Sequence, residues 1–232
     1  MRLMKLATLC YHKVGTEAKE GRRLNIHPDR LDSHVRFFKR RNYRFVKGSD
    51  LVQWPEEKTV CFTFDDGFVS TIDNGVPVLE RHQVPMSVYV VSGFVGKASE
   101  WEGELARPLA GWDSLRKIQE LGHEVGNHTV SHLRLGDLDG SEQRKQIREC
   151  HEAMLAEGLH PVSFCYPYGS LNAESDQVLQ SSDYQVGLAL GKRLPQTSDS
   201  QLAIPRIVIA YGDALPLLIY RLWIRPKLLS SK

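Results

Sequence analysis

Short runs of apolar residues recur along the chain at spacings that fit strands separated by helices. Many of their residues are β-branched or aromatic, as in the Thr-Val-Cys-Phe segment at 59–62. A short continuous apolar run bounded by polar residues is typical of a buried strand. We predict strands at 6–10, 60–64, 86–91, 162–165, 186–190 and 202–209, with a short strand that ends at Val125.

Between most of these runs, apolar residues recur every three or four positions, which is the spacing of one helix face. The sets are Leu31, Val35 and Phe38, then Leu115, Ile118 and Leu121 behind Asp113 as an N-cap, then Ile147, Cys150 and Met154. Strands that alternate with helices pair in parallel through right-handed crossovers. The pattern therefore predicts an α/β fold, an irregular (β/α) barrel of about seven parallel strands. We expect residues 1–232 to form this single domain, because no linker or internal repeat is evident.

Two acidic residues directly follow the predicted strand 60–64. Asp65 and Asp66 stand at its carboxyl end, and Gly67 lets the chain turn sharply there. Carboxylates are not tolerated in a dry core unless they are paired or bind a metal. Their position at the mouth of a strand indicates a site, although Asp-Asp-Gly is also common in ordinary turns.

Two histidines four positions apart supply further candidate ligands. On one helical turn, His128 and His132 would share a face with their Cβ atoms about 5–6 Å apart. One carboxylate and two imidazoles leave a position open for water, which is typical of a catalytic zinc site. With nine histidines in the chain, such a pair also arises readily by chance. The two motifs together, each after an apolar run, favour a metal site.

These motifs resemble those of the polysaccharide deacetylases with a NodB homology domain, also called carbohydrate esterase family four, from about residue 6 to about residue 209. In that family, the first Asp of Thr-Phe-Asp-Asp-Gly is a catalytic base and the second is a metal ligand beside two histidines. The resemblance implies that Asp65 is the base and that one divalent metal is held. Its ligands would be Asp66, His128 and His132, and zinc is expected, with nickel, cobalt or manganese as alternatives.

A third family motif lines the substrate groove, and the segment from Tyr166 to Gly169 is similar to its Tyr-Pro-Tyr-Gly form. The resemblance implies that Tyr166, Pro167 and Tyr168 bind the sugar. Trp112 is a further candidate for a sugar-facing ring, but it is explained equally well as a core anchor at the start of a helix.

The usual form of this third motif has an arginine that pairs with the catalytic aspartate, and Cys165 stands in that place. Arg206 is our candidate substitute. An arginine near Asp65 would keep that carboxylate ionised and oriented through a charge-assisted hydrogen bond. The sequence leaves an ordinary surface position for Arg206 nearly as open.

The family's usual C-terminal catalytic histidine is also missing, since no histidine follows His160. Tyr11-His12 resembles the start of the circularly permuted branch, in which an early histidine takes the place of the general acid. His12 is therefore the candidate acid, with an unperturbed pKa of about 6.5 that suits proton donation near neutrality. Without the family, a structural role for His12 would be favoured.

The implied activity is that of a metal-dependent hydrolase that removes N-acetyl or similar acyl groups from an amino sugar in a polysaccharide, oligosaccharide or lipid-linked glycan precursor. Two alternatives stay open. A metal-dependent amidohydrolase acting on a non-sugar amide or cyclic imide would need a small closed pocket rather than an open groove, and the insert 94–111 could build either. A non-catalytic carbohydrate-binding relative would fit the missing C-terminal histidine.

Composition excludes some partners. A net charge of +2 gives no electrostatic footprint for nucleic acid. A basic cluster at 36–44 reads as the solvated side of a helix. The four cysteines lack metal-type spacing, and three of them lie in apolar runs, so they are expected to be buried thiols.

The two ends of the chain bear on its location. Residues 1–5 show no sustained apolar segment of a secretory signal, which favours a cytoplasmic enzyme. The apolar segment 214–225 is too short to span a bilayer. It has the ingredients of an interfacial helix, and hence of peripheral contact with the inner face of the membrane, although a final helix packed on the barrel is the more ordinary interpretation.

Overall fold

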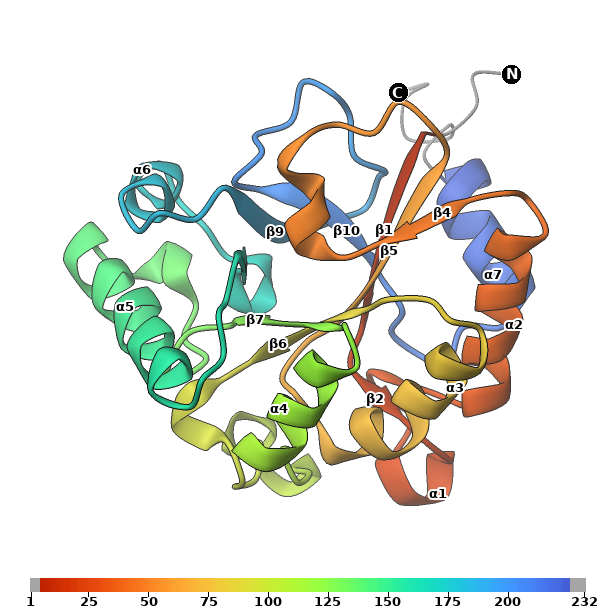
Figure 1. Ribbon diagram of the computed structural model, residues 1–232, viewed down its shortest axis with the longest axis horizontal. Helices are drawn as coiled ribbons and strands as arrows, with labels where there is room; N and C mark the ends of the chain where they lie inside the picture. The colour runs from red at the N-terminus through yellow and green to blue at the C-terminus, as the bar shows by residue number, and fades with distance from the viewer. Residues whose placement is uncertain (1–4, 226–232) are drawn as a thin grey trace.

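The computed structural model describes residues 5–225, in which strands and helices alternate (Figure 1). The strands are β1 (Leu6–Tyr11), β2 (Lys13–Val14), β3 (Asn25–Ile26), β4 (Arg44–Val46), β5 (Thr59–Phe64), β6 (Ser87–Val90), β7 (Glu124–Asn127), β8 (Ser163–Cys165), β9 (Val186–Gly191) and β10 (Ile204–Val208). The α-helices are α1 (Glu17–Glu20), α2 (Pro28–Lys39), α3 (Val76–Arg81), α4 (Trp112–Glu120), α5 (Gly140–Ala156), α6 (Ser175–Gln180) and α7 (Leu215–Ile219). Each apolar run that was predicted to be a strand overlaps one of these strands.

The main sheet closes on itself. Its order is β1-β10-β9-β8-β7-β6-β5, and β5 pairs again with β1, so seven parallel strands form a ring. The helices lie around this ring, with α2, α3 and α7 on one side and α5 and α6 on the other (Figure 1). The predicted (β/α) barrel of about seven parallel strands is therefore confirmed.

The pairing of β1 with β5 brings two predicted site segments together. The two strands run parallel and in register, from Leu6 beside Thr59 to Tyr11 beside Phe64. The next residue of each strand is therefore also adjacent, and the Asp65 N–H donates to the Tyr11 carbonyl at 3.0 Å. His12 and Asp65 thus leave the barrel side by side at its carboxyl end.

One strand of the main sheet was not predicted, and neither were the two short strands β2 and β3, which pair with each other. β4 pairs with the first half of β5, where Arg44 lies beside Thr59, whereas β6 pairs with the second half, where Thr63 lies beside Ser87. The two strands therefore share one edge of β5. Since β4 has only three residues and just one of them is fully buried, its sequence carries too little apolar pattern to be recognised.

Two details of the predicted helix near residue 115 were wrong. Gly111, not Asp113, is the N-cap of α4, and Asp113 lies in the first turn, where it forms an ion pair with Arg116. Leu121 lies past the end of the helix and is 53% exposed. The buried face consists of Leu115 and Ile118.

Polar side chains fill the amino-terminal part of the barrel. The Tyr89 hydroxyl lies 2.6 Å from Ser163 Oγ, which donates to Glu124 Oε1 at 2.7 Å. Ser87 Oγ donates to the other Glu124 oxygen at 2.6 Å. Buried polar groups are costly unless they are hydrogen-bonded, and this network satisfies them. The barrel is thus closed at this end, which leaves its carboxyl end for a site.

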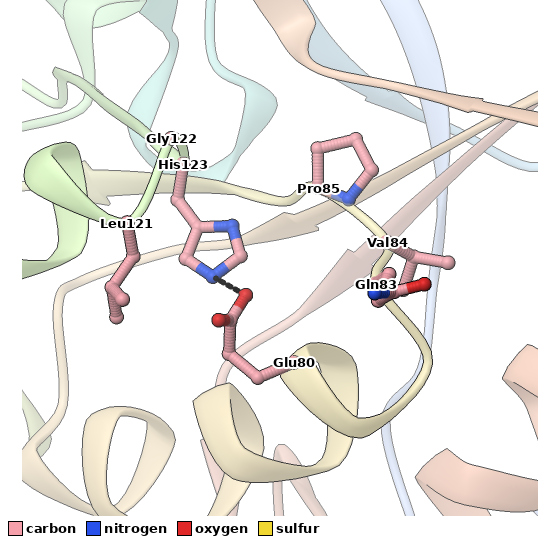
Figure 2. A pocket seen from close by; sticks show the side chains of 7 residues that line it. All are labelled: Glu80, Gln83, Val84, Pro85, Leu121, Gly122 and His123. Atoms are coloured by element: carbon pink, nitrogen blue, oxygen red, sulfur yellow. Dashed lines mark ion pairs between the residues drawn. The ribbon is translucent and has the colours of Figure 1, made fainter.

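A cavity of about 340 Å³ lies at the closed end (Figure 2). It is lined by Glu80, Gln83, Val84, Pro85, Leu121, Gly122 and His123. These residues end α3 and α4 or precede β6 and β7, so the cavity lies at the amino ends of the strands. His123 Nε2 lies 3.1 Å from a Glu80 carboxylate oxygen there. This cavity is remote from Asp65 and Asp66.

The C-terminal segment packs on the barrel. Leu218 on α7 and Leu222 on the following turn are buried, and the Trp223 ring lies 5.4 Å from the Phe37 ring on α2. Within residues 5–225, no helix is long and apolar enough to cross a membrane. A final helix packed on the barrel therefore accounts for the buried residues of this segment.

Candidate metal centre and active site

Three predicted metal ligands meet at the carboxyl end of the barrel. Asp66 follows β5, and His128 follows β7 directly. His132 does not share a helical turn with His128, as the spacing had suggested. The segment between them is an irregular loop in which Thr129 and His132 both have positive φ, 71° and 55°. The spacing of four led to the correct pair, but the wrong local structure was predicted.

Side-chain hydrogen bonds hold this loop in shape. The Thr129 N–H donates to Asn127 Oδ1 at 2.8 Å, and the His132 N–H donates to Thr129 Oγ1 at 3.1 Å. The Asn127 amide donates in turn to the Ile147 carbonyl on α5 at 2.9 Å. Asn and Thr side chains often replace backbone partners in such turns. The chain thus fixes His132 opposite His128 without a helix.

The three ligand atoms form a compact, buried cluster. Nε2 of His132 lies 3.1 Å and Nε2 of His128 lies 3.5 Å from Asp66 Oδ1. All three potential ligand atoms lie within 4.8 Å of one another. Asp66 Oδ1 is buried and receives no hydrogen bond of good geometry from the described residues. Ligand atoms that share a tetrahedral zinc are roughly 3.4 Å apart, so the spacing fits a divalent cation.

The two imidazoles are oriented in different ways. His128 donates its Nδ1–H to the Cys165 carbonyl at 2.7 Å, which leaves the Nε2 lone pair directed at the cluster. Nδ1 of His132 is buried and has no hydrogen-bond partner among the described residues. Two rings hold it instead, Trp101 at 4.2 Å and Tyr168 at 4.6 Å between centroids. Trp101 was not among the predicted site residues, since no spacing in the sequence connects it to His132.

Asp65 is bound by a buried arginine. Arg206 donates from Nη1 to Oδ1 at 2.6 Å and from Nη2 to Oδ2 at 2.8 Å. Its other N–H groups donate to the Ala189 carbonyl, Thr63 Oγ1 and Cys165 Sγ. Burial would raise the pKa of Asp65, but the charge and hydrogen bonds of Arg206 outweigh it and hold this pKa well below its usual range. The predicted pairing of these two residues is thus present in the structure.

Two thiols lie against the same carboxylate. Cys10 Sγ is 3.3 Å and Cys165 Sγ 3.5 Å from Asp65 Oδ2. Burial raises the pKa of both thiols well above the usual value, so they stay neutral S–H groups. All four cysteines are buried and free, as predicted. The Asp65 carboxylate is therefore surrounded by donors rather than by competing charges.

His12 also lies beside Asp65. One nitrogen of its ring, Cys10 Sγ and an Asp65 oxygen all lie within 4.8 Å of one another. Burial lowers the pKa of His12, while the charges of Asp66 and Asp65 oppose this shift. The structure therefore brings together six of the predicted site residues. These are Asp65, Asp66, His12, His128, His132 and Arg206.

Only some of the predicted sugar-binding residues lie at the site. Tyr168 is 41% exposed and its ring lies against the His132 ring. Pro167 is buried. Tyr166 is only 1% exposed and packs 4.9 Å from the Phe164 ring in an outer core cluster, so it offers no face to a sugar. Trp112 begins α4 and packs against the main core.

A long insert between β6 and α4 forms one wall of the site. It carries Trp101, whose ring packs edge-on against Phe94 at 5.3 Å. The next residue, Glu102, accepts from Lys13 Nζ at 3.1 Å, and these side chains are only 7% and 2% exposed. Ion pairs that exclude water hold their geometry better than exposed ones. This pair fixes the insert to the barrel end next to the metal ligands.

Known proteins match this chain in sequence and in fold. A family model described as polysaccharide deacetylase matches residues 53–187, a segment that contains Asp66 and His132 but neither His12 nor Arg206. A poly-beta-1,6-N-acetyl-D-glucosamine N-deacetylase of Staphylococcus aureus is 18% identical over 227 residues, covering 89% of this chain and 74% of that protein.

Two solved structures are similar in fold. The Streptococcus pyogenes deacetylase PplD, in complex with acetate, has a TM-score of 0.78 at 19% identity, covering 94% of this chain and 98% of that one. IcaB from Ammonifex degensii has a TM-score of 0.76 at 22% identity, covering 93% and 95%. At these identities the two likenesses support the barrel fold.

Proposed function

We propose, because the chain belongs to the polysaccharide deacetylase family, that it is a metal-dependent hydrolase that removes N-acetyl groups from an amino sugar in a saccharide. One observation carries the proposal. The buried pair of Asp65 and Arg206 lies directly beside the cluster of Asp66, His128 and His132. A base and a three-ligand cation site in contact are what water-driven amide hydrolysis requires.

The substrate class follows from similarity. The relative from Staphylococcus aureus is named for the removal of N-acetyl groups from poly-beta-1,6-N-acetyl-D-glucosamine. By analogy, we assign to this chain a linear acetamide on an N-acetylglucosamine unit. The exposed ring of Tyr168 beside His132 supports a site that is open to a saccharide, because aromatic faces suit the apolar faces of sugar rings.

Asp66, His128 and His132 would hold the metal. A bound divalent metal supplies Lewis-acid polarisation of the acetamide and lowers the pKa of water. Zinc suits the donor set of two imidazoles and one carboxylate. The unpartnered Asp66 Oδ1 and the fixed tautomer of His128 both support this assignment.

The remaining residues would move protons and position the substrate. Asp65, held ionised by Arg206, accepts a proton from the attacking water. The backbone N–H of Tyr168 would donate a hydrogen bond to the oxyanion that develops at the acetamide carbonyl. His12, which also lies beside Asp65, donates a proton to the departing amine, so that acetate and the free amino sugar leave. The presence of His12 in the cluster favours an enzyme over a non-catalytic binding protein.

The direct test is acetate release from N-acetylglucosamine oligosaccharides by zinc-loaded protein. We expect release by the wild type and a loss of about 10²–10⁴-fold in kcat for Asp65→Asn, which keeps the shape of the side chain but not its basicity. Turnover by Asp65→Asn at the rate of the wild type would contradict the assigned base. No release by the wild type from any saccharide would contradict the deacetylase.

A further inference from the structure

An arginine extends the aromatic stack at the mouth of the site. The guanidinium of Arg134 lies 4.5 Å from the centroid of the Tyr168 ring. That ring lies 4.6 Å from the ring of His132. Arg134 follows His132 by two residues and is exposed. A cation is thus held one aromatic ring away from the metal ligands, on the solvent side.

This cation has no acidic partner in the described part of the chain. No ion pair or side-chain hydrogen bond within residues 5–225 involves the guanidinium of Arg134 or that of Arg23. Other arginines of the molecule do have carboxylate partners, as Arg193 has Asp199 at 2.5 Å. The nearby acid Glu102 is already taken by Lys13. The guanidinium of Arg134 therefore carries a positive charge that no paired carboxylate of the described residues neutralises.

A second arginine, Arg23, lies on a loop at the same end of the barrel. The next residue, Leu24, accepts a hydrogen bond from the Lys13 N–H at 2.9 Å, and Lys13 in turn pairs with Glu102 beside Trp101. Burial and the charges of Asp66 and Glu102 raise the pKa of Tyr168, whereas the positive charges of Arg134 and Arg23 oppose this shift. Arg23 lies in the exposed loop between α1 and β3. Two segments that are far apart in sequence therefore place cations at this end of the barrel. A divalent metal on Asp66 would add to this positive field.

We infer that the saccharide acted on at this site carries an anionic oxygen group, a phosphate or a carboxylate, next to the N-acetyl sugar, and that Arg134 with Arg23 binds it. This inference rests on the proposed deacetylase function. Arginine presents a rigid fork of N–H donors that matches such groups in two-point contacts. Stacking on Tyr168 limits the motion of the Arg134 guanidinium and so lowers the entropy cost of binding.

The test compares matched substrates. The probes are an N-acetylglucosamine tetrasaccharide, the same tetrasaccharide with one phosphate monoester, and a tetrasaccharide with one uronic acid unit. We measure kcat/KM for acetate release from each probe by zinc-loaded protein. The quantity compared is the ratio of kcat/KM for an anionic probe to kcat/KM for the neutral probe. Arg134→Gln should lower this ratio about tenfold, the usual size of a lost hydrogen bond to a charged group. Arg134→Lys should retain part of it, and added salt should lower it in the wild type.

Arg40→Gln is the matched control, since Arg40 is exposed at the carboxyl end of α2 and so at the opposite end of the barrel. It should leave the ratio at the wild-type value. The phosphate and uronate arms show which anion is preferred. A wild-type ratio near one for both anions, or equal ratios in the wild type and Arg134→Gln, would overturn the inference and leave the deacetylase standing.

Calorimetric binding of the three probes separates the two claims. If the wild type releases no acetate from any probe, the proposed function fails, and binding alone decides the anion site. Tighter binding of an anionic probe that Arg134→Gln weakens would uphold the site. Equal binding of neutral and anionic probes would overturn it.

Discussion

Asp65 and Arg206, which are 141 positions apart in the sequence, meet in a two-point ion pair with contacts of 2.6 and 2.8 Å. Both side chains are almost completely buried. Because the guanidinium holds both carboxylate oxygens, it fixes the plane of the carboxylate as well as its charge. The orientation of the proposed base thus depends on a residue outside the segment that matches the family model.

Arg206→Lys should preserve the charge but not the two-point contact, since one ammonium cannot span both oxygens. We expect kcat for acetate release to fall about 10²-fold or more, because a misplaced base loses most of its effect. Zinc content should stay at the wild-type level. Arg193→Lys changes an exposed two-point pair with Asp199 and is the control. Activity of Arg206→Lys within threefold of the control would contradict the role.

His12→Gln removes the proposed acid and keeps a polar side chain of similar size. We expect kcat to fall about 10²–10³-fold, the range for loss of a general acid, while zinc binding and the melting temperature stay unchanged. The exposed His27→Gln serves as the reference. A His12→Gln protein with wild-type kcat would show that another group protonates the amine.

Trp101→Ala should loosen His132, because this imidazole is held by ring contacts rather than by a hydrogen bond. Loss of an outer-shell support commonly costs about 10–100-fold in metal affinity. Competition with a chromophoric chelator measures this affinity directly. Trp101→Phe should recover most of it, and Trp112→Phe, which changes a ring against the core, should have no effect. An unchanged zinc affinity in Trp101→Ala would disprove the support.

Stability should fall in mild acid because of His34. This side chain is fully buried against the Tyr11 hydroxyl, and burial lowers its pKa to about 4. The unfolded histidine titrates near 6.5, so unfolding takes up a proton between these two values. His34 therefore contributes its full stabilisation above about pH 6.5. As the pH falls toward 4 this stabilisation is lost, and the free energy of unfolding decreases by about 3 kcal/mol.

Urea unfolding from pH 7 to pH 4 measures this loss. His34→Gln should show a smaller decrease in the free energy of unfolding over that range, whereas the exposed His160→Gln should keep the wild-type slope. If His34→Gln and the wild type lose the same free energy, the buried neutral state of His34 is not the cause.

The barrel was predictable because its strands are nearly continuous apolar runs. All six residues of β1 and all six of β5 are buried, and no other structure needs such runs at such spacing. β4 was missed because it has only three residues, of which the first is exposed. β4 pairs with the half of the β5 edge that β6 leaves free. This pairing depends on the tertiary structure and leaves no pattern in the sequence of β4.

The site was predictable where the chain puts its ligands at strand ends. Asp66 is the second residue after β5 and His128 is the first after β7, and the parallel sheet brings these ends together. The aromatic support of His132 and the arginine stack were not predictable, because Trp101 and Arg134 lie on irregular segments whose course no periodicity encodes. Tyr166 belongs to a motif with the right composition, but the local backbone turns its ring into the outer core.

We propose that Asp66, His128 and His132 hold one divalent metal and that acetate release requires this metal. Metal content by mass spectrometry, measured together with acetate release, tests it on the wild type, Asp66→Ala and the exposed control Asp113→Ala. We predict one metal ion per chain with release in the wild type and the control, and loss of both in Asp66→Ala. Acetate release by Asp66→Ala, or by wild-type protein free of metal, would contradict the claim.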